Sequence, residues 1–233
     1  MNGYSAEQVR AAEAPHLAAG EPLMMIAAAG LADAIRDVLH DREADAGASI
    51  LVLVGTGNNG GDALFAGAEL AREGADVVLL PVGERMHAEG REAALAAGAR
   101  IRRPGEALAG LAKVAARADV IVDGILGTGT GASPALRGTA REVVAAILPA
   151  LRGRRRPAVI AVDIPSGVSP DDGSVPDPTV LPADVTVTFG GVKAGLLLPP
   201  ASRLAGRVRL VDIGLGPELA RMEPLLIAPD TAE

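Results

Sequence analysis

The feature that most constrains this fold is a series of short apolar segments, rich in Val, Ile and Leu, that alternate with segments of helical length. We expect strands at Ile50–Val54, Val77–Leu80, Val120–Val122, Val159–Val162, Val185–Phe189 and Val208–Val211. These runs are almost continuously hydrophobic, which is typical of strands that are covered on both faces. Between them we expect helices at Asp62–Glu73, Arg85–Ala97, Glu106–Arg117 and Leu136–Leu151. This alternation predicts an α/β fold, with a mainly parallel sheet between helices on both faces.

The chain shows no long polar linker and no internal repeat, so we expect a single domain over residues 1–233. Two helices, at Ala6–Ala19 and Pro22–Asp41, are expected ahead of the sheet. The basic segment Arg152–Pro157 is interpreted as a solvated helix C-terminus, where cations suit the helix dipole, rather than a binding patch. The long segment Ser166–Pro182 is expected to form a pocket wall or lid.

Composition excludes several classes of function. The chain has no cysteine, which rules out disulfides, thiol nucleophiles and iron–sulfur clusters and suits a reducing compartment. Aromatic residues make up 1% of the chain and the net charge is −7, so we expect no nucleic-acid partner. The apolar run Leu23–Ala29 is too short to span a bilayer and the first residues lack a signal-peptide pattern. We therefore expect a cytoplasmic protein with no membrane association.

A glycine-rich turn follows the first expected strand. Gly55, Gly57 and Gly60 fit the G-x-G-x-x-G pattern, in which backbone N–H groups approach a phosphate closely. The usual fingerprint of redox dinucleotide binders also needs an acid at the end of the next strand, to bind the ribose hydroxyl. That strand ends at Leu80 and Pro81 instead, and Glu84 lies beyond the turn. Conventional redox binding is therefore disfavoured.

Two further strands each end in an aspartate. Asp123 follows Val120–Val122 and precedes a second glycine-rich loop, and Asp163 follows Val159–Val162 and precedes Ser166. A single such aspartate is often a helix cap or a turn former. Ligands of open α/β sheets bind outside the carboxyl ends of the strands, so two aspartates beside two glycine-rich loops indicate a ligand site.

The remaining side chains limit the chemistry of that site. His16, His40 and His87 are expected in helices remote from the strand ends, which disfavours a Ser-His-Asp triad or a His-ligated metal. Lys193 follows the strand Val185–Phe189, and it is expected either in the same crevice or on a surface loop. Proton transfer would then depend on an aspartate.

Oxygen donors at the same edge suit a hard cation. The amide of Asn59, the carboxylate of Asp123 and the hydroxyl of Ser166 are the kinds of ligand that such ions prefer. Together with the glycine-rich loops, these residues predict a phosphate-bearing ligand, an oxygen-ligated cation and Asp-based proton transfer.

At this level of detail the chain resembles the NAD(P)H-hydrate epimerases, the YjeF N-terminal-domain family. Four motifs occur in the family's order: Gly-Asn-Asn-Gly-Gly-Asp at 57–62, Asp123 with Gly127-Thr128-Gly129, Asp163-Ile164-Pro165-Ser166-Gly167, and Thr188-Phe189-Gly190 with Lys193 and Gly195. The resemblance extends from about Ser5 to about Gly216, nearly the whole chain.

The resemblance implies a Rossmann-like three-layer α/β/α sandwich that forms a homodimer. It also implies a reaction that interconverts the R and S epimers at C6 of hydrated NADH or NADPH, called NADHX and NADPHX. A bound potassium ion and a separate dehydratase, which restores the cofactor from the S epimer, are implied as well.

The resemblance also implies roles for individual residues. Asp163 and Lys193 match the catalytic centre, and Asn59, Asp123 and Ser166 match the potassium ligands. The implied substrate-binding residues are Asn58, Asn59, Gly60, Gly61, Asp62, Gly127, Thr128, Gly129, Thr130, Gly131, Ala132, Ser133 and Asp163. Inversion at C6 would pass through a ring-opened or an iminium species, and the sequence does not choose between them.

Two departures and two alternatives accompany this interpretation. Ala63 stands where the family usually has Gly, and Ala27 where it usually has an acid. A non-catalytic binding module on the same fold is the main alternative, and a conventional oxidoreductase is another. Asn59, Asp123, Asp163 and Ser166 all persist, which favours an enzyme over a binding module.

Overall fold

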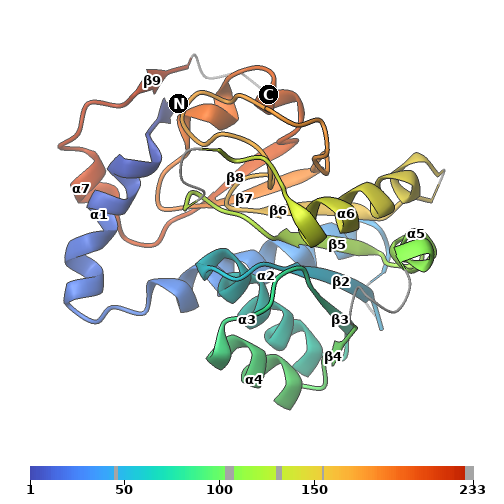
Figure 1. Ribbon diagram of the computed structural model, residues 1–233. Helices are drawn as coiled ribbons and strands as arrows, with labels where there is room; N and C mark the ends of the chain where they lie inside the picture. The colour runs from blue at the N-terminus through green and yellow to red at the C-terminus, as the bar shows by residue number, and fades with distance from the viewer. Residues whose placement is uncertain (45–46, 103–107, 130–132, 154, 229–233) are drawn as a thin grey trace.

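A computed structural model describes residues 1–44, 47–102, 108–129, 133–153 and 155–228. Within them, seven strands form one sheet in the order β4-β3-β2-β5-β6-β7-β8, and every neighbouring pair is parallel (Figure 1). The strands are β2 (Ser49–Val54), β3 (Asp76–Pro81), β4 (Arg100–Ile101), β5 (Val120–Gly124), β6 (Ala158–Val162), β7 (Val185–Phe189) and β8 (Arg207–Val211). The predicted α/β fold with a mainly parallel sheet is confirmed.

Helices cover both faces of this sheet (Figure 1). Helices α2 (Leu23–Asp41), α3 (Asn58–Arg72) and α4 (Ala88–Ala96) pack in sequence along one face, and α5 (Leu108–Ala115) and α6 (Gly138–Ile147) lie on the other. Helix α1 (Ala6–Ala18) and the short α7 (Gly216–Leu219) contact each other beyond the sheet. In the described residues, 3₁₀ helices occupy Leu148–Arg152, Ala194–Leu197 and Ala201–Arg203, and β1 (Asn2–Gly3) pairs antiparallel with β9 (Leu226–Ile227).

The strand order reverses direction at the centre of the sheet. From β2 the chain moves outward through β3 to β4, and then returns to place β5 on the other side of β2. All parallel strands present their carboxyl ends at one edge, and open α/β sheets bind ligands at such a reversal point. The glycine-rich segment after β2 and the aspartates of β5 and β6 therefore share this edge.

The sequence did not predict strand β4, and two further differences concern α3 and β8. Helix α3 begins at Asn58 rather than Asp62, so the residues from Asn58 to Asp62 form its first turn instead of a loop. Strand β8 lies at the edge of the sheet, and Leu210 is 49% exposed, so this strand is not buried on both faces. The sequence run of Val208–Val211 is too short to distinguish an edge strand from a central one.

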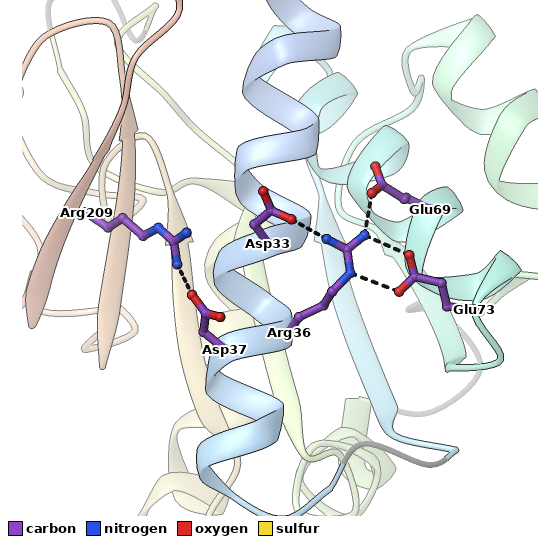
Figure 2. A network of polar contacts seen from close by, with 6 residues as sticks. All are labelled: Asp33, Arg36, Asp37, Glu69, Glu73 and Arg209. Carbon is purple, nitrogen blue, oxygen red and sulfur yellow. Dashed lines mark hydrogen bonds and ion pairs between the residues drawn. The ribbon is translucent and has the colours of Figure 1, made fainter.

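A set of ion pairs fastens α2 to its neighbours on both sides (Figure 2). Arg36 contacts Asp33 of its own helix, and Glu69 and Glu73 at the C-terminal end of α3. Arg209 of β8 donates a hydrogen bond to Asp37 of α2. The guanidinium of Arg36 binds Glu73 through two hydrogen bonds, of 2.7 and 2.9 Å, which fixes the orientation of both side chains. No helix in the described residues is both long and apolar enough to cross a membrane.

Candidate active site

The candidate active site lies at the carboxyl edge of the sheet, around the ends of β2, β5, β6 and β7. Asp123 belongs to β5, Asp163 directly follows β6, and Lys193 comes soon after β7. All three side chains are buried in the protein, with residue exposures of 0%, 8% and 2%. Charged side chains rarely occupy such positions unless they are paired, so their partners indicate what each can do.

Asp163 and Lys193 form a buried ion pair. Nζ of Lys193 lies 2.5 Å from Oδ1 of Asp163, and it also donates to the carbonyl oxygen of Phe189 at 2.9 Å. The hydroxyl of Thr188 donates to the same Asp163 oxygen at 3.1 Å. Lys193 therefore does not belong to a surface loop, the alternative that the sequence left open. Its ammonium stabilises a negative charge on Asp163.

Backbone geometry sets the positions of both partners. Asp163 has a φ of +66°, a conformation that few residues other than Gly, Asn and Asp adopt, and its N–H donates to the carbonyl of Val187 at 2.7 Å. Unusual backbone conformations of this kind cluster at functional sites. On the other side, Tyr4 pairs with the segment around Lys193, because its N–H and C=O bond Val192 and Ala194 at 2.8 and 2.9 Å. The N-terminal segment thus helps to hold the lysine in place.

Asp62 is a second buried carboxyl group near this pair, on the first turns of α3. The residue is 8% exposed, and no hydrogen bond to its side chain is found among the described residues. Burial, followed by the charges of Asp163 and Glu13, raises the pKa of Asp62 well above its usual value, and Lys193 opposes this. Asp62 therefore favours the protonated form, whereas Asp163 is paired with an ammonium group.

Glu13 of α1 belongs to the same electrostatic group, and sequence reasoning missed it. Its pKa is raised, mainly by burial, and it interacts with both Lys193 and Asp163. Helix α1 reaches the site because Arg10 donates to the carbonyl of Thr128 at 3.2 Å and the N–H of Ala6 donates to Asp171 at 2.7 Å. These contacts are tertiary, and no sequence pattern near Glu13 indicates them.

Asp123, Ser166 and Asn59 converge on the backbone of Leu126. Asp123 accepts hydrogen bonds from the Ser166 hydroxyl at 2.6 Å and from the Ser166 N–H at 2.9 Å. The Ser166 hydroxyl in turn accepts from the Leu126 N–H at 2.9 Å, and the Asn59 amide donates to the Leu126 carbonyl at 3.1 Å. Burial raises the pKa of Asp123, and the hydrogen bonds from Ser166 and Ile125 oppose this effect.

These residues could hold an oxygen-ligated cation. Its donor set consists of one carboxylate, one amide, one hydroxyl and one carbonyl, and no hydrogen bond to Oδ1 of Asn59 is found among the described residues. Among the residues that the structure describes, no group of three or more His, Asp or Glu side chains could hold a metal ion. Carboxylate, amide, hydroxyl and carbonyl oxygens are the kinds of donor that hard cations prefer, so these residues could hold such an ion.

The two glycine-rich loops pack directly against each other. A Cβ atom on Gly55 would lie 1.9 Å from the carbonyl oxygen of Ile125, and one on Gly127 would lie 2.9 Å from Oδ1 of Asn59. Ala63, which replaces the family's usual glycine, has its Cβ against Gly124 of β5 and is buried. This substitution therefore faces the sheet and does not narrow a ligand site.

The other expected binding residues lie around these loops. Asn58 is exposed, and Asn59, Gly60 and Gly61 are buried in the first turn of α3. Gly129 is exposed, and Gly127, Thr128 and Ser133 are half-buried, in the segment after β5. Thr130, Gly131 and Ala132 lie outside the described residues.

The expected position of His87 is wrong. His16 and His40 lie in helices α1 and α2 as predicted, but His87 precedes α4 and caps it by accepting a hydrogen bond from the N–H of Gly90 at 3.2 Å. A Cβ on Gly61 would meet the His87 ring at 3.2 Å, so this histidine lies beside the first turn of α3. No sequence pattern indicates this contact, because it joins two different βα units.

Comparisons with known proteins agree with this arrangement. The family model described as "YjeF-related protein N-terminus" matches residues 20–195. The NAD(P)H-hydrate epimerase of Clavibacter michiganensis subsp. michiganensis is 56% identical over 228 residues, which cover 97% of this chain and 96% of that protein. The NAD(P)H-hydrate epimerase of Microbacterium testaceum is 48% identical over 225 residues, 97% of this chain and 83% of that protein.

A longer relative and a solved structure complete the comparison. The bifunctional NAD(P)H-hydrate repair enzyme of Mycobacterium tuberculosis is 41% identical over 219 residues, 91% of this chain and 41% of that protein. The crystal structure of yeast ynu0 matches with a TM-score of 0.70 at 22% identity, over 84% of this chain and 83% of that one. This structural match supports the fold.

Proposed function

The chain belongs to the YjeF-related N-terminal family, and from this premise we propose that it is an NAD(P)H-hydrate epimerase, an isomerase that interconverts the R and S epimers at C6 of NADHX and NADPHX. The observation that carries the proposal is that the Asp163 carboxyl group, held by Lys193, lies near a second buried carboxyl group, Asp62, at the carboxyl edge of the sheet. Relatives that bear the name of this activity match nearly the full chain.

The two glycine-rich loops support binding of the dinucleotide. Among the described residues, no side chain caps the N-terminus of α3 at Asn58, so its first backbone N–H groups and the positive end of the helix dipole can favour a pyrophosphate. A Cβ placed on Gly57 would meet no atom within 4 Å, so the approach to this helix end is open. In the proposal, the pyrophosphate lies here and the hydrated nicotinamide ring extends toward Asp163.

Inversion at C6 needs one bond at that carbon to break and form again. In the dehydration route, the leaving hydroxyl must gain a proton, and the water that adds from the opposite face must lose one. A neutral Asp62 can donate the first proton, and an ionised Asp163 can accept the second. The ring-opening route uses the same two groups, because N1 then gains a proton and the hydroxyl loses one. Lys193 is the positioning residue that holds the Asp163 carboxylate through its hydrogen bond to Oδ1.

We further propose that Asn59, Asp123 and Ser166 hold a potassium ion. When bound, such an ion would supply positive charge that offsets the buried carboxylates and attracts the pyrophosphate. The oxygen donors around Leu126 support this part of the proposal. Replacing potassium by choline at constant ionic strength tests it, because activity should fall while the protein remains folded.

The proposal includes two partners. A dehydratase would consume the S epimer, and the bifunctional repair enzyme of Mycobacterium tuberculosis is the relative whose name joins two activities. We place the reaction in the cytoplasm and propose a homodimer. Leu17, Met25 and Ile26 on α1 and α2 support a protein contact, because they are 58%, 50% and 40% exposed. Light scattering of wild type and Ile26→Asp tests the dimer.

A coupled assay tests the proposed activity. An S-specific dehydratase is given a mixture of R-NADHX and S-NADHX, and NADH formation is followed by absorbance. Without an epimerase, the rapid phase ends when the S epimer is consumed. With this protein, conversion should run to completion at the rapid rate. A rapid phase that still stops at the S fraction would contradict the proposal.

A further inference from the structure

A cleft of about 950 Å³ lies beside the candidate active site, at the carboxyl ends of β3 and β4. Its lining comes from the segment after β3 and from the N-terminal turns of α4, α5 and α6, and includes Val82, Arg85, Met86, Arg91, Leu108 and Glu142. A cavity of this size, with a mixed apolar and charged lining, is typical of sites for small ligands. None of these residues belongs to the machinery described above.

The cleft is adjacent to the first glycine-rich loop. A Cβ on Gly83, which lines the cleft, would lie 2.4 Å from Cγ2 of Thr56 in that loop. The N–H of Val82 also donates to the carbonyl of Val54 at 3.0 Å, so the segments that follow β2 and β3 start side by side. A ligand bound at the N-terminus of α3 can therefore extend into the cleft.

The position in the sheet indicates which half of a dinucleotide the cleft would take. The strand order reverses between β2 and β5, and a dinucleotide binds across such a reversal. Asp163 and Lys193 lie on one side, after β6 and β7, and the cleft lies on the other side, after β3 and β4. With the nicotinamide ring at Asp163, the adenosine half is left for the cleft.

Charged residues of the cleft bear on the ribose. In dinucleotide sites, an acid at the end of this strand binds the ribose 2′-hydroxyl, and a nearby arginine accommodates a 2′-phosphate. Strand β3 ends at Pro81 without an acid, and Arg85 and Arg91 are exposed and form no ion pair with any other described residue. Glu84 and Glu142 also line the cleft, so its lining contains acidic as well as basic side chains.

We propose that this cleft binds the adenosine half of the hydrated dinucleotide and that Arg85 and Arg91 bind its 2′-phosphate, which makes NADPHX the preferred substrate. The inference rests on the proposed epimerase function. A guanidinium binds phosphate through short, charge-assisted and often bidentate hydrogen bonds, which a ribose hydroxyl cannot match.

Kinetics on both hydrates test the proposal. The double variant Arg85→Ala/Arg91→Ala should raise KM for NADPHX about tenfold or more, while KM for NADHX and both kcat values stay near wild type. Arg72→Ala is the matched control, because this exposed arginine lies at the far end of α3, away from the cleft lining. Equal effects on both hydrates, or no effect on either, would overturn the proposal.

A binding measurement separates this inference from the epimerase function. Adenosine 2′,5′-bisphosphate and 5′-AMP are titrated into the wild type and the double variant by calorimetry. The wild type should bind the bisphosphate about tenfold more tightly, and the double variant should bind the two alike. Equal binding by the wild type would refute the cleft assignment even if the enzyme is an active epimerase. The predicted preference in a protein without epimerase activity would support the cleft and refute the proposed function alone.

Discussion

Replacing Lys193 by Met isolates the contribution of the buried ion pair. Methionine keeps an unbranched stem of similar length but has no ammonium group. Lys193 is 2% exposed and donates to Asp163, to the Phe189 carbonyl and to Thr188, so all of its hydrogen bonds are made inside the protein. After the substitution, the Thr188 hydroxyl is the side-chain donor that remains on the Asp163 carboxylate. The acids Asp62 and Glu13 lie nearby.

The magnitude follows from the burial of the pair. Removing one partner of a buried ion pair costs about 3–5 kcal/mol, because the other charge stays buried without compensation. In a domain of this length, each kcal/mol shifts the melting temperature by about 2–4 °C. We therefore expect Lys193→Met to lower the melting temperature by about 6–20 °C at neutral pH.

The measurements are thermal and urea denaturation of four proteins: wild type, Lys193→Met, Asp163→Asn, and the double variant. The double variant should recover most of the loss of Lys193→Met, because the Asp163 carboxylate that loses its partner is then absent. Lys113→Met is the control, since this lysine is exposed on α5 and should change stability by no more than about 0.5 kcal/mol. A cost below about 1 kcal/mol for Lys193→Met, or a double variant as unstable as the single one, would refute the reasoning.

Three further predictions address other parts of the site. Asp62→Asn should raise the melting temperature near pH 7 and abolish epimerisation. The pKa of Asp62 is raised in the folded state, so rising pH ionises this group in the unfolded chain first. The free energy of unfolding of the wild type then falls by about 1.4 kcal/mol per unit of pKa difference, a loss that Asn avoids. Melting scans over pH check this, and wild-type activity should fall as pH rises through the raised pKa. Gly55→Ala should destabilise the fold by about 3 kcal/mol or more in urea, because its Cβ would lie 1.9 Å from the Ile125 carbonyl, whereas Gly57→Ala, with no atom within 4 Å, should be near neutral. Asn59→Ala should remove the dependence of activity on potassium in a potassium–choline titration, and a retained dependence would exclude Asn59 as a ligand.

Much of the sheet could be predicted from the sequence, because buried parallel strands need continuous apolar runs. The runs around Ile50–Val54 and Val185–Phe189 lie within one residue of the observed strands. The edge strand β8 could not be distinguished in this way, since an apolar run does not indicate whether a neighbour covers it. The start of α3 at Asn58 was also missed, because Asn and Gly are more typical of turns and caps than of helices.

The site was predictable where its residues directly follow strands. Asp123 and Asp163 stand at strand ends, and parallel strands bring their carboxyl ends to one edge. Glu13 and His87 could not be placed, since each reaches the site through packing between distant segments. The roles of Asp62 and Lys193 depend on burial and on exact partners, which residue type and spacing do not specify.

Epimer exchange tests the central claim most directly. Purified R-NADHX is incubated with the protein and potassium, and the S epimer is followed by chromatography. We predict rapid equilibration with the wild type, and exchange at the spontaneous rate with Asp163→Asn, although this variant should still bind adenosine 2′,5′-bisphosphate. Exchange by Asp163→Asn at the wild-type rate, or none above the spontaneous rate with folded wild-type protein, would contradict the account.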